Sequence, residues 1–247
     1  MKDFEPSTLW RISAFEQARQ SGQLGAGRDD RPTLLPTTLL ADLRQLHRYP
    51  SNDDVLEVIA ACMRNREAAL LYLQHGHNVW PVTLFPRQEV YHSPREASQM
   101  SGAGMGTLRV ISAEPPGVKP PGDAMHDRIA RGDRYHPIAA LLWAVALQGP
   151  RTTLLTEISG RVAYRLVSSA SPKDMPSSLG ALSSAVAKLR QEAASLRDVA
   201  SWPGLSVERA SRLLNALYLT GALMVSRSHP AARAEPRGWR GWLGRRR

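Results

Sequence analysis

Four side chains in one short stretch have the chemistry to contact DNA: Arg209, Ser211, Arg212 and Asn215. An arginine fork reaches O6 and N7 of guanine together, an asparagine reaches N6 and N7 of adenine, and Ser206 and Ser211 suit phosphate. At helical spacing these residues fall largely opposite a stripe of apolar residues. We therefore predict that they contact nucleic acid. The alternative is a solvated helix face, where Arg and Ser are common.

The C-terminal tail is the second group of residues with binding chemistry. Arginines neutralise phosphates, and indole rings stack on bases or lie in a bilayer interface. The composition predicts binding to nucleic acid, to an anionic membrane surface or, as a short linear motif, to a groove on a protein. The alternative is a disordered, solubilising end. The predicted tail-binding residues are Arg237, Trp239, Arg240, Trp242, Arg245, Arg246 and Arg247.

The positive charge is concentrated in this tail. The chain has a net charge of +10, and residues 226–247 hold seven arginines against the single Glu235, which gives +6. The rest of the chain therefore carries +4. The body of the protein is only mildly basic, less so than most DNA-binding modules.

No residues at a recognisable spacing indicate catalysis. The sequence contains no HExxH, no GxSxG and no Walker lysine after a glycine loop, so we expect a non-enzymatic protein without a cofactor. The run Gly102 to Gly106 precedes a predicted strand, whereas a phosphate loop follows a strand, so we interpret it as a turn. His75 and His77 flank Gly76 without a nearby Cys, Asp or Glu, which indicates an exposed turn and no metal site.

The predicted DNA contacts lie within residues 195–228, a pattern typical of a short helix, a tight turn, a longer helix and a strand. Trp202-Pro203-Gly204 ends the first helix. Ser206 is the predicted N-cap of the second helix, which should end at Gly221. Leu223 to Val225 is the predicted strand.

This pattern resembles the winged helix-turn-helix family of bacterial regulators over about Ser177 to Ser228. A predicted helix over 179–189 would be the first of the three helices, and Leu223 to Val225 the first wing strand. A second wing strand is not evident, because His229-Pro230 and a Pro-, Gly- and Arg-rich tail follow. Family members bind DNA with this unit or use it for packing and dimerisation. The resemblance implies that the helix capped by Ser206, together with Arg227, contacts nucleic acid. Glu208 counts against this contact, because a carboxylate repels phosphate.

The N-terminal half is predicted to be an α/β domain over 36–114, preceded over 1–35 by a helix and a flexible connection. Periodicity predicts helices near 7–20, 37–47 and 53–66, and strands at 69–73, 79–85, 89–92 and 107–113. The first two strands form a predicted hairpin. The order of helix and hairpin resembles roadblock-type domains, which partner small GTPases.

The PPGVKPPG segment at 115–122 is the predicted domain boundary, within a Pro/Gly-rich linker over 115–135. The remainder, 136–228, is predicted to be a helical domain with the winged-helix-like unit at 177–228, followed by the tail at 229–247. Residues 161–167 suit a helix or a strand equally. The predicted fold class is α+β: N-terminal helices with a small antiparallel sheet, then a mainly helical C-terminal half.

Composition limits the remaining possibilities. Hydrophobic residues make up 43% and charged residues 22% of the 247 residues, as in ordinary globular proteins. The single Cys62 excludes an intramolecular disulfide and a cysteine-rich zinc site. The first residues lack an apolar signal core, and the longest uncharged apolar run, Ile138 to Leu147, is too short to cross a bilayer. We expect a cytoplasmic protein without a transmembrane segment.

Two functions of different classes follow from these features. The first is a DNA-binding regulator, in which the winged-helix-like unit contacts a site, the tail adds affinity, and the N-terminal domain self-associates or senses a signal. The second is a protein–protein adaptor or scaffold, in which the winged-helix-like unit serves packing and the tail anchors the protein to a partner or a membrane. The first is our prediction.

Overall fold

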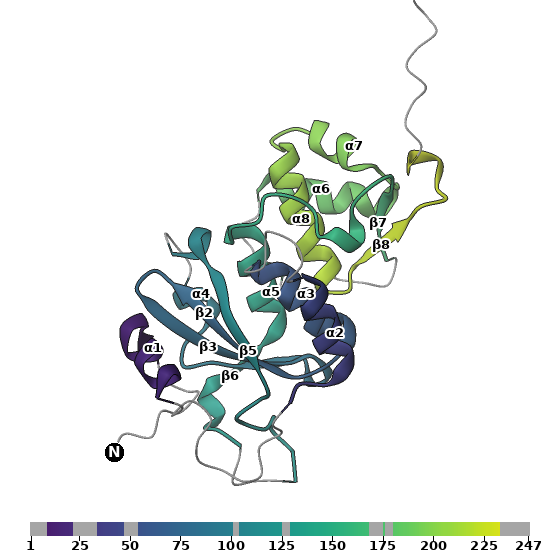
Figure 1. The fold of residues 1–247 in the computed structure, drawn as a ribbon. Helices are drawn as coiled ribbons and strands as arrows, with labels where there is room; N and C mark the ends of the chain where they lie inside the picture. Colours follow the sequence, from purple (N-terminus) through teal and green to yellow (C-terminus); the bar gives the residue numbers. More distant parts are fainter. Residues whose placement is uncertain are drawn as a thin grey trace, which may run out of the picture. The chain divides into compact units, whose positions relative to one another are not determined.

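The computed structural model describes residues 9–21, 34–46, 54–100, 104–124, 129–167, 175 and 180–232 (Figure 1). The chain forms two compact units, unit 1 (Met1–Thr152 with Pro172–Ser177) and unit 2 (Thr153–Ser171 with Ser178–Arg247). The fold is α+β, as predicted. Within the described ranges, no helix has the length and apolar character needed to cross a membrane.

Unit 1 is built on an antiparallel sheet in the order β5-β2-β3-β4-β6, with β1 paired to the beginning of β3. The predicted hairpin is confirmed: β2 and β3 pair from Ala69↔Leu84 to His75↔Asn78, and Gly76 provides the left-handed turn residue with φ +59°. The strands are β1 (Trp10–Arg11), β2 (Ala69–His75), β3 (Asn78–Phe85), β4 (Val90–His92), β5 (Arg109–Glu114) and β6 (Tyr135–Pro137).

Helices pack on this sheet because its strands are apolar along their length. Phe15 of α1 lies in a cluster with Leu70, Tyr72 and Val79, while the alternate residues Leu71 and Leu73 are also fully buried. Helix α3 contacts β5, and α5 contacts β4 and β6. The helices are α1 (Ile12–Gln20), α2 (Thr37–Leu46), α3 (Val55–Asn65), α4 (Ala97–Met100) and α5 (Ile138–Gln148).

A buried ion-pair cluster fixes the beginning of α3 to the residues that follow α5. Asp54 caps α3 by accepting a hydrogen bond from the N–H of Leu56 at 2.9 Å. The other carboxylate oxygen of Asp54 pairs with Arg151 Nη1, and Arg151 Nη2 pairs with Glu57 Oε1 at 2.9 Å. All three side chains are largely buried, at 10 to 14% exposure.

The chain divides near residue 152, whereas the sequence suggested a boundary at 115–122. The PPGVKPPG segment lies inside unit 1, because β6 extends the sheet by pairing with β4 and α5 packs against the same strands. Strand β6 and helix α5, expected to begin the C-terminal domain, therefore complete the N-terminal one.

The described residues of unit 2 form three helices and a small sheet. Within residues 161–167, four residues form a strand, β7 (Ala163–Leu166), which pairs antiparallel with β8 (Leu223–Ser226) and bridges Ala194 through Tyr164. The beginning of unit 2 holds a single 3-10 turn, η5 (Thr156–Ile158), and a second one, η6 (Pro230–Ala232), follows β8. The helices are α6 (Ala181–Gln191), α7 (Leu196–Ser201) and α8 (Val207–Leu219).

Candidate nucleic-acid interface

The corner between α7 and α8 is held by capping hydrogen bonds. Ser195 and Asp198 form a capping box at the beginning of α7, with the Ser195 N–H donating to the Asp198 carboxylate at 2.9 Å. Ser206 caps α8 as predicted, because its Oγ accepts from the N–H of Arg209 at 3.2 Å. Gly204 supplies the turn between the helices with φ +76°. These contacts fix the orientation of α8 relative to α7 and leave the first turn of α8 exposed to solvent.

The two predicted arginines of α8 lie at this first turn and just beyond it. Arg209 is exposed, and its Nη1 donates to the carbonyl of Gly204 at 2.6 Å. The Arg212 side chain is 15% exposed, and its Nε donates to Glu208 Oε1 at 3.0 Å. A guanidinium has five N–H donors, so Arg209 retains donors for a phosphate. Arg212 is partly neutralised by Glu208.

Ser211 and Asn215 do not lie on the surface, contrary to their predicted role. Ser211 is 1% exposed and donates to the carbonyl of Val207 at 2.8 Å. Asn215 is fully buried; its Oδ1 accepts from the N–H of Leu155 and its Nδ2 donates to the carbonyl of Thr153, each at 2.9 Å. Both side chains satisfy polar groups inside unit 2, so neither can reach a base or a phosphate.

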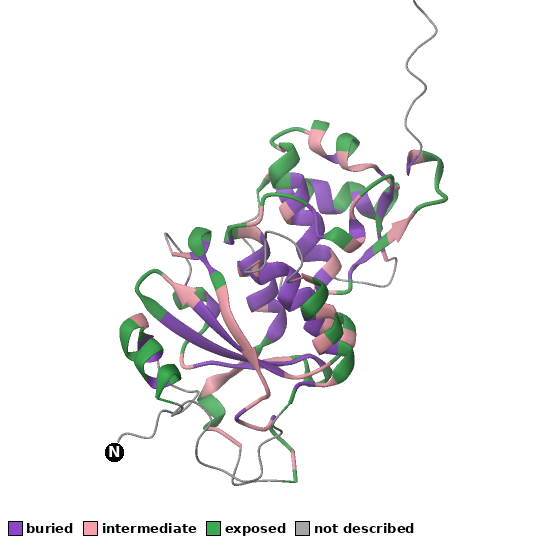
Figure 2. Ribbon diagram, in the orientation of Figure 1, coloured by how far each residue is buried: buried purple, intermediate pink, exposed green. Residues whose placement is uncertain are grey.

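Helix α8 is consequently a core helix for most of its length. Among its residues only Val207, Glu208 and Arg209 are exposed, and Arg212 and Tyr218 are partly exposed (Figure 2). A helix that reads the major groove needs an accessible row of side chains, of which the N-terminal ones usually contact bases. Only the first turn of α8 meets this requirement.

The small sheet supplies the strand that the sequence lacked after β8. Strand β7 lies between β8 and Ala194: the N–H of Tyr164 donates to the carbonyl of Ala194 at 2.8 Å, and Leu166 pairs with Leu223. The partner of β8 is therefore a strand that precedes the three helices in the sequence. No hairpin joins the two strands, because β7 and β8 are far apart in the sequence.

Arg227 lies at the end of this sheet. It is exposed, and its Nη2 donates to the carbonyl of Glu157 at 3.3 Å. Its charge also acts on Tyr164: burial raises the pKa of Tyr164 to about 12, and Arg227 partly opposes this shift. The Tyr164 hydroxyl donates to the carbonyl of Ile158 at 2.7 Å. Arg227 thus remains available to solvent while fixing the η5 segment.

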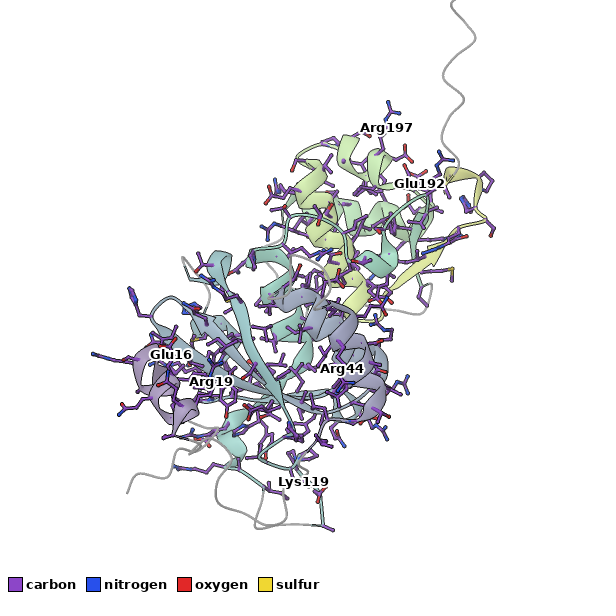
Figure 3. The ribbon with its side chains drawn as sticks, viewed as in Figure 1. Glu16, Arg19, Arg44, Lys119, Glu192 and Arg197 are labelled. Carbon is purple, nitrogen blue, oxygen red and sulfur yellow. The ribbon has the colours of Figure 1, made fainter. Side chains whose placement is uncertain are left out.

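The division of the chain also divides its charge. Residues 153–247 carry fifteen Lys and Arg against six Asp and Glu, a net charge of +9, which leaves +1 for residues 1–152. Two carboxylates of unit 2 are engaged within it, since Asp198 closes the capping box and Glu208 pairs with Arg212. Arg197, at the beginning of α7, points away from the ribbon (Figure 3). Basic character is therefore a property of the second unit as well as of the tail.

Other sequence candidates have simpler roles or lie outside the described residues. The predicted tail-binding residues from Arg237 to Arg247 belong to the part of the chain that the structure does not describe. His75 packs beside Gly104, and its Nε2 lies 3.1 Å from the carbonyl of Met100. Across the described ranges, no three His, Cys, Asp or Glu side chains are grouped as a metal site.

No protein-family model, curated protein or solved structure matches this chain. The site must therefore be judged from its own residues. Sequence reasoning gave no role to Arg161 and Arg165, because it left residues 161–167 unassigned. In the sequence RVAYR, arginine or alanine alternates with an apolar residue. This alternation is the signal from which a strand could have been predicted.

Proposed function

We propose that this is a non-enzymatic, cytoplasmic regulatory protein whose second unit binds DNA, aided by the basic tail. The observation that carries the proposal is the division of charge between the units, +9 in residues 153–247 against +1 in residues 1–152. A polyanion would be attracted to one unit only, since counterion release from DNA grows with the number of phosphates that Lys and Arg neutralise.

The geometry supports phosphate contacts more than base contacts. The first turn of α8 offers Arg209, and Arg227 lies exposed at the end of β8. Asn215, the residue best suited to a second base contact, is buried, as is Ser211. We therefore propose binding that is mainly sequence-independent, with any selectivity coming from Arg209 and Arg212.

The test is a titration of fluorescent duplex DNA of random sequence at several salt concentrations. The full chain is compared with a variant ending at Ala232, which keeps all described residues and removes the rest of the tail. Affinity that survives this truncation and falls steeply with salt supports a DNA surface on unit 2. Absence of binding by both proteins refutes the proposal, and binding that disappears with the tail limits it to residues 233–247.

A second candidate function, the protein–protein adaptor, is favoured by the apolar surface of the α7–α8 corner. Val207 is 61% exposed at the beginning of α8, and Trp202 and Leu205 beside it are partly exposed. Lys188 lies over the Trp202 ring, 5.1 Å from its centroid. These side chains suit a protein partner better than a phosphate backbone. An adaptor of this kind would not bind duplex DNA, and Val207→Asp would weaken its self-association as measured by sedimentation.

A further inference from the structure

Two exposed arginines lie on β7 and just before it, at Arg165 and Arg161. Arg165 is exposed, and its register partner on β8 is Met224, which is 53% exposed. The neighbours of Arg165 along the strand, Tyr164 and Leu166, are buried on the opposite side. Arg161 is also exposed and lies in the bend that precedes β7.

Among the described residues, no carboxylate lies within ion-pair distance of these two arginines. In the described part of the chain, neither Arg161 nor Arg165 forms an ion pair. The residues on the same side of the β7–β8 pair as Arg165 are Ala163, Met224 and Ser226, none of which is acidic. By contrast, Arg212 of α8 is paired with Glu208. The charge on β7 is therefore more available to an anion than the charge of Arg212.

The described chain ends against the same strand. The 3-10 turn η6 contacts β7, and its last residue, Ala232, is 7% exposed. Ala163, on the side of β7 that bears the arginines, is also buried, at 1% exposure. From Ala232 the sequence continues with six arginines and one glutamate. Ala232, the last described residue before the basic tail, thus belongs to a turn that contacts the strand carrying Arg165.

We infer that two exposed arginines, Arg165 on β7 and Arg161 just before the strand, form the main phosphate-contacting surface of unit 2. This inference rests on the proposed DNA binding and identifies the surface responsible for it. Its ligand is the backbone of duplex DNA, contacted without reading of bases. In this arrangement the sheet provides affinity, and the first turn of α8 is a secondary contact.

The test measures how affinity for one duplex DNA varies with salt between about 50 and 200 mM, using the full chain. The variants are R161Q/R165Q, the charge-retaining R161K/R165K and, as a control for loss of charge, R19Q/R44Q in unit 1, where both arginines are exposed (Figure 3). Each lost phosphate contact should lower the slope of log K against log salt by about 0.9, so R161Q/R165Q should lose about 2. The other two variants should match the wild-type protein.

The possible results distinguish a failure of this inference from a failure of the proposed DNA binding. If the wild-type protein binds DNA and R161Q/R165Q shows the same slope of log K against log salt, the inference is overturned and the proposed function is kept. An equal loss of slope in R19Q/R44Q also overturns the inference, because it would show an effect of overall charge. A wild-type protein that does not bind DNA overturns both. Equal melting temperatures of all variants confirm that the comparison concerns binding and not folding.

Discussion

Asn215 Oδ1 accepts a hydrogen bond from the backbone N–H of Leu155 at 2.9 Å, which ties α8 to a segment sixty residues earlier in the chain. Asn215 also donates to the carbonyl of Thr153 at 2.9 Å. Both groups that it satisfies belong to backbone that forms no regular helix or strand. A residue of the expected recognition face thus serves to fix the 153–158 segment against the helix.

Asn215→Ala should accordingly destabilise unit 2. The Leu155 N–H would lose its partner in a buried position, and we expect the free energy of unfolding to fall by roughly 3 kcal/mol. Ser211→Ala is the matched control: its Oγ bonds to the carbonyl of Val207 within the same helix, so the loss should be below about 1 kcal/mol. Urea denaturation measures both. Equal stability of the two variants would contradict the structural role of Asn215.

The double variant Arg209→Ala with Arg212→Ala tests the first turn of α8. We expect weaker DNA binding and loss of any preference between DNA sequences, because these are the arginines of α8 that reach its accessible turn. Competition between two duplexes of different sequence measures that preference. R19A/R44A is the matched control on unit 1. If the α8 variant retained both affinity and preference, these residues would not be DNA contacts.

Local signals in the sequence predicted most helices and strands but not the residues that pack around them. Ser206 and Gly221 predicted the extent of α8, since caps and glycine act on neighbouring residues. The burial of Asn215 depends on its contact with Leu155, and no local sequence pattern predicts a contact between residues so far apart in the chain. Residues 161–167 were ambiguous for the same reason: they become a strand by pairing with Ala194 and with 223–226.

Arg151→Met should destabilise unit 1. It would leave the carboxylates of Asp54 and Glu57 close together and largely buried without their cation. Removing one partner of a buried ion pair typically costs about 3 to 5 kcal/mol, and we expect a loss of that order in denaturant titrations. Arg151→Lys retains the charge but not the fork that reaches both carboxylates, so its loss should be smaller. A Met variant as stable as wild type would mean that the cluster contributes no net stability.

Acid should destabilise unit 1 through His92. The side chain is fully buried in β4, and its pKa is lowered to about 4 by burial, with further contributions from the charges of Arg134 and His136. In the unfolded chain the same imidazole titrates near pH 6.5, at about its ordinary value, so below that pH the unfolded state binds the proton first. The stabilisation is complete above about pH 6.5 and is lost as the pH falls towards 4, by roughly 3 kcal/mol in all.

The measurement is the free energy of unfolding between pH 7 and pH 4, for wild type and His92→Gln. The variant cannot take up this proton, so its stability should decline less steeply over that range, even if it is less stable at neutral pH. His77→Gln is the control, since His77 is exposed in the β2–β3 turn, and it should follow the wild-type curve. A His92→Gln curve parallel to wild type would show that other groups, such as the carboxylates, cause the acid sensitivity.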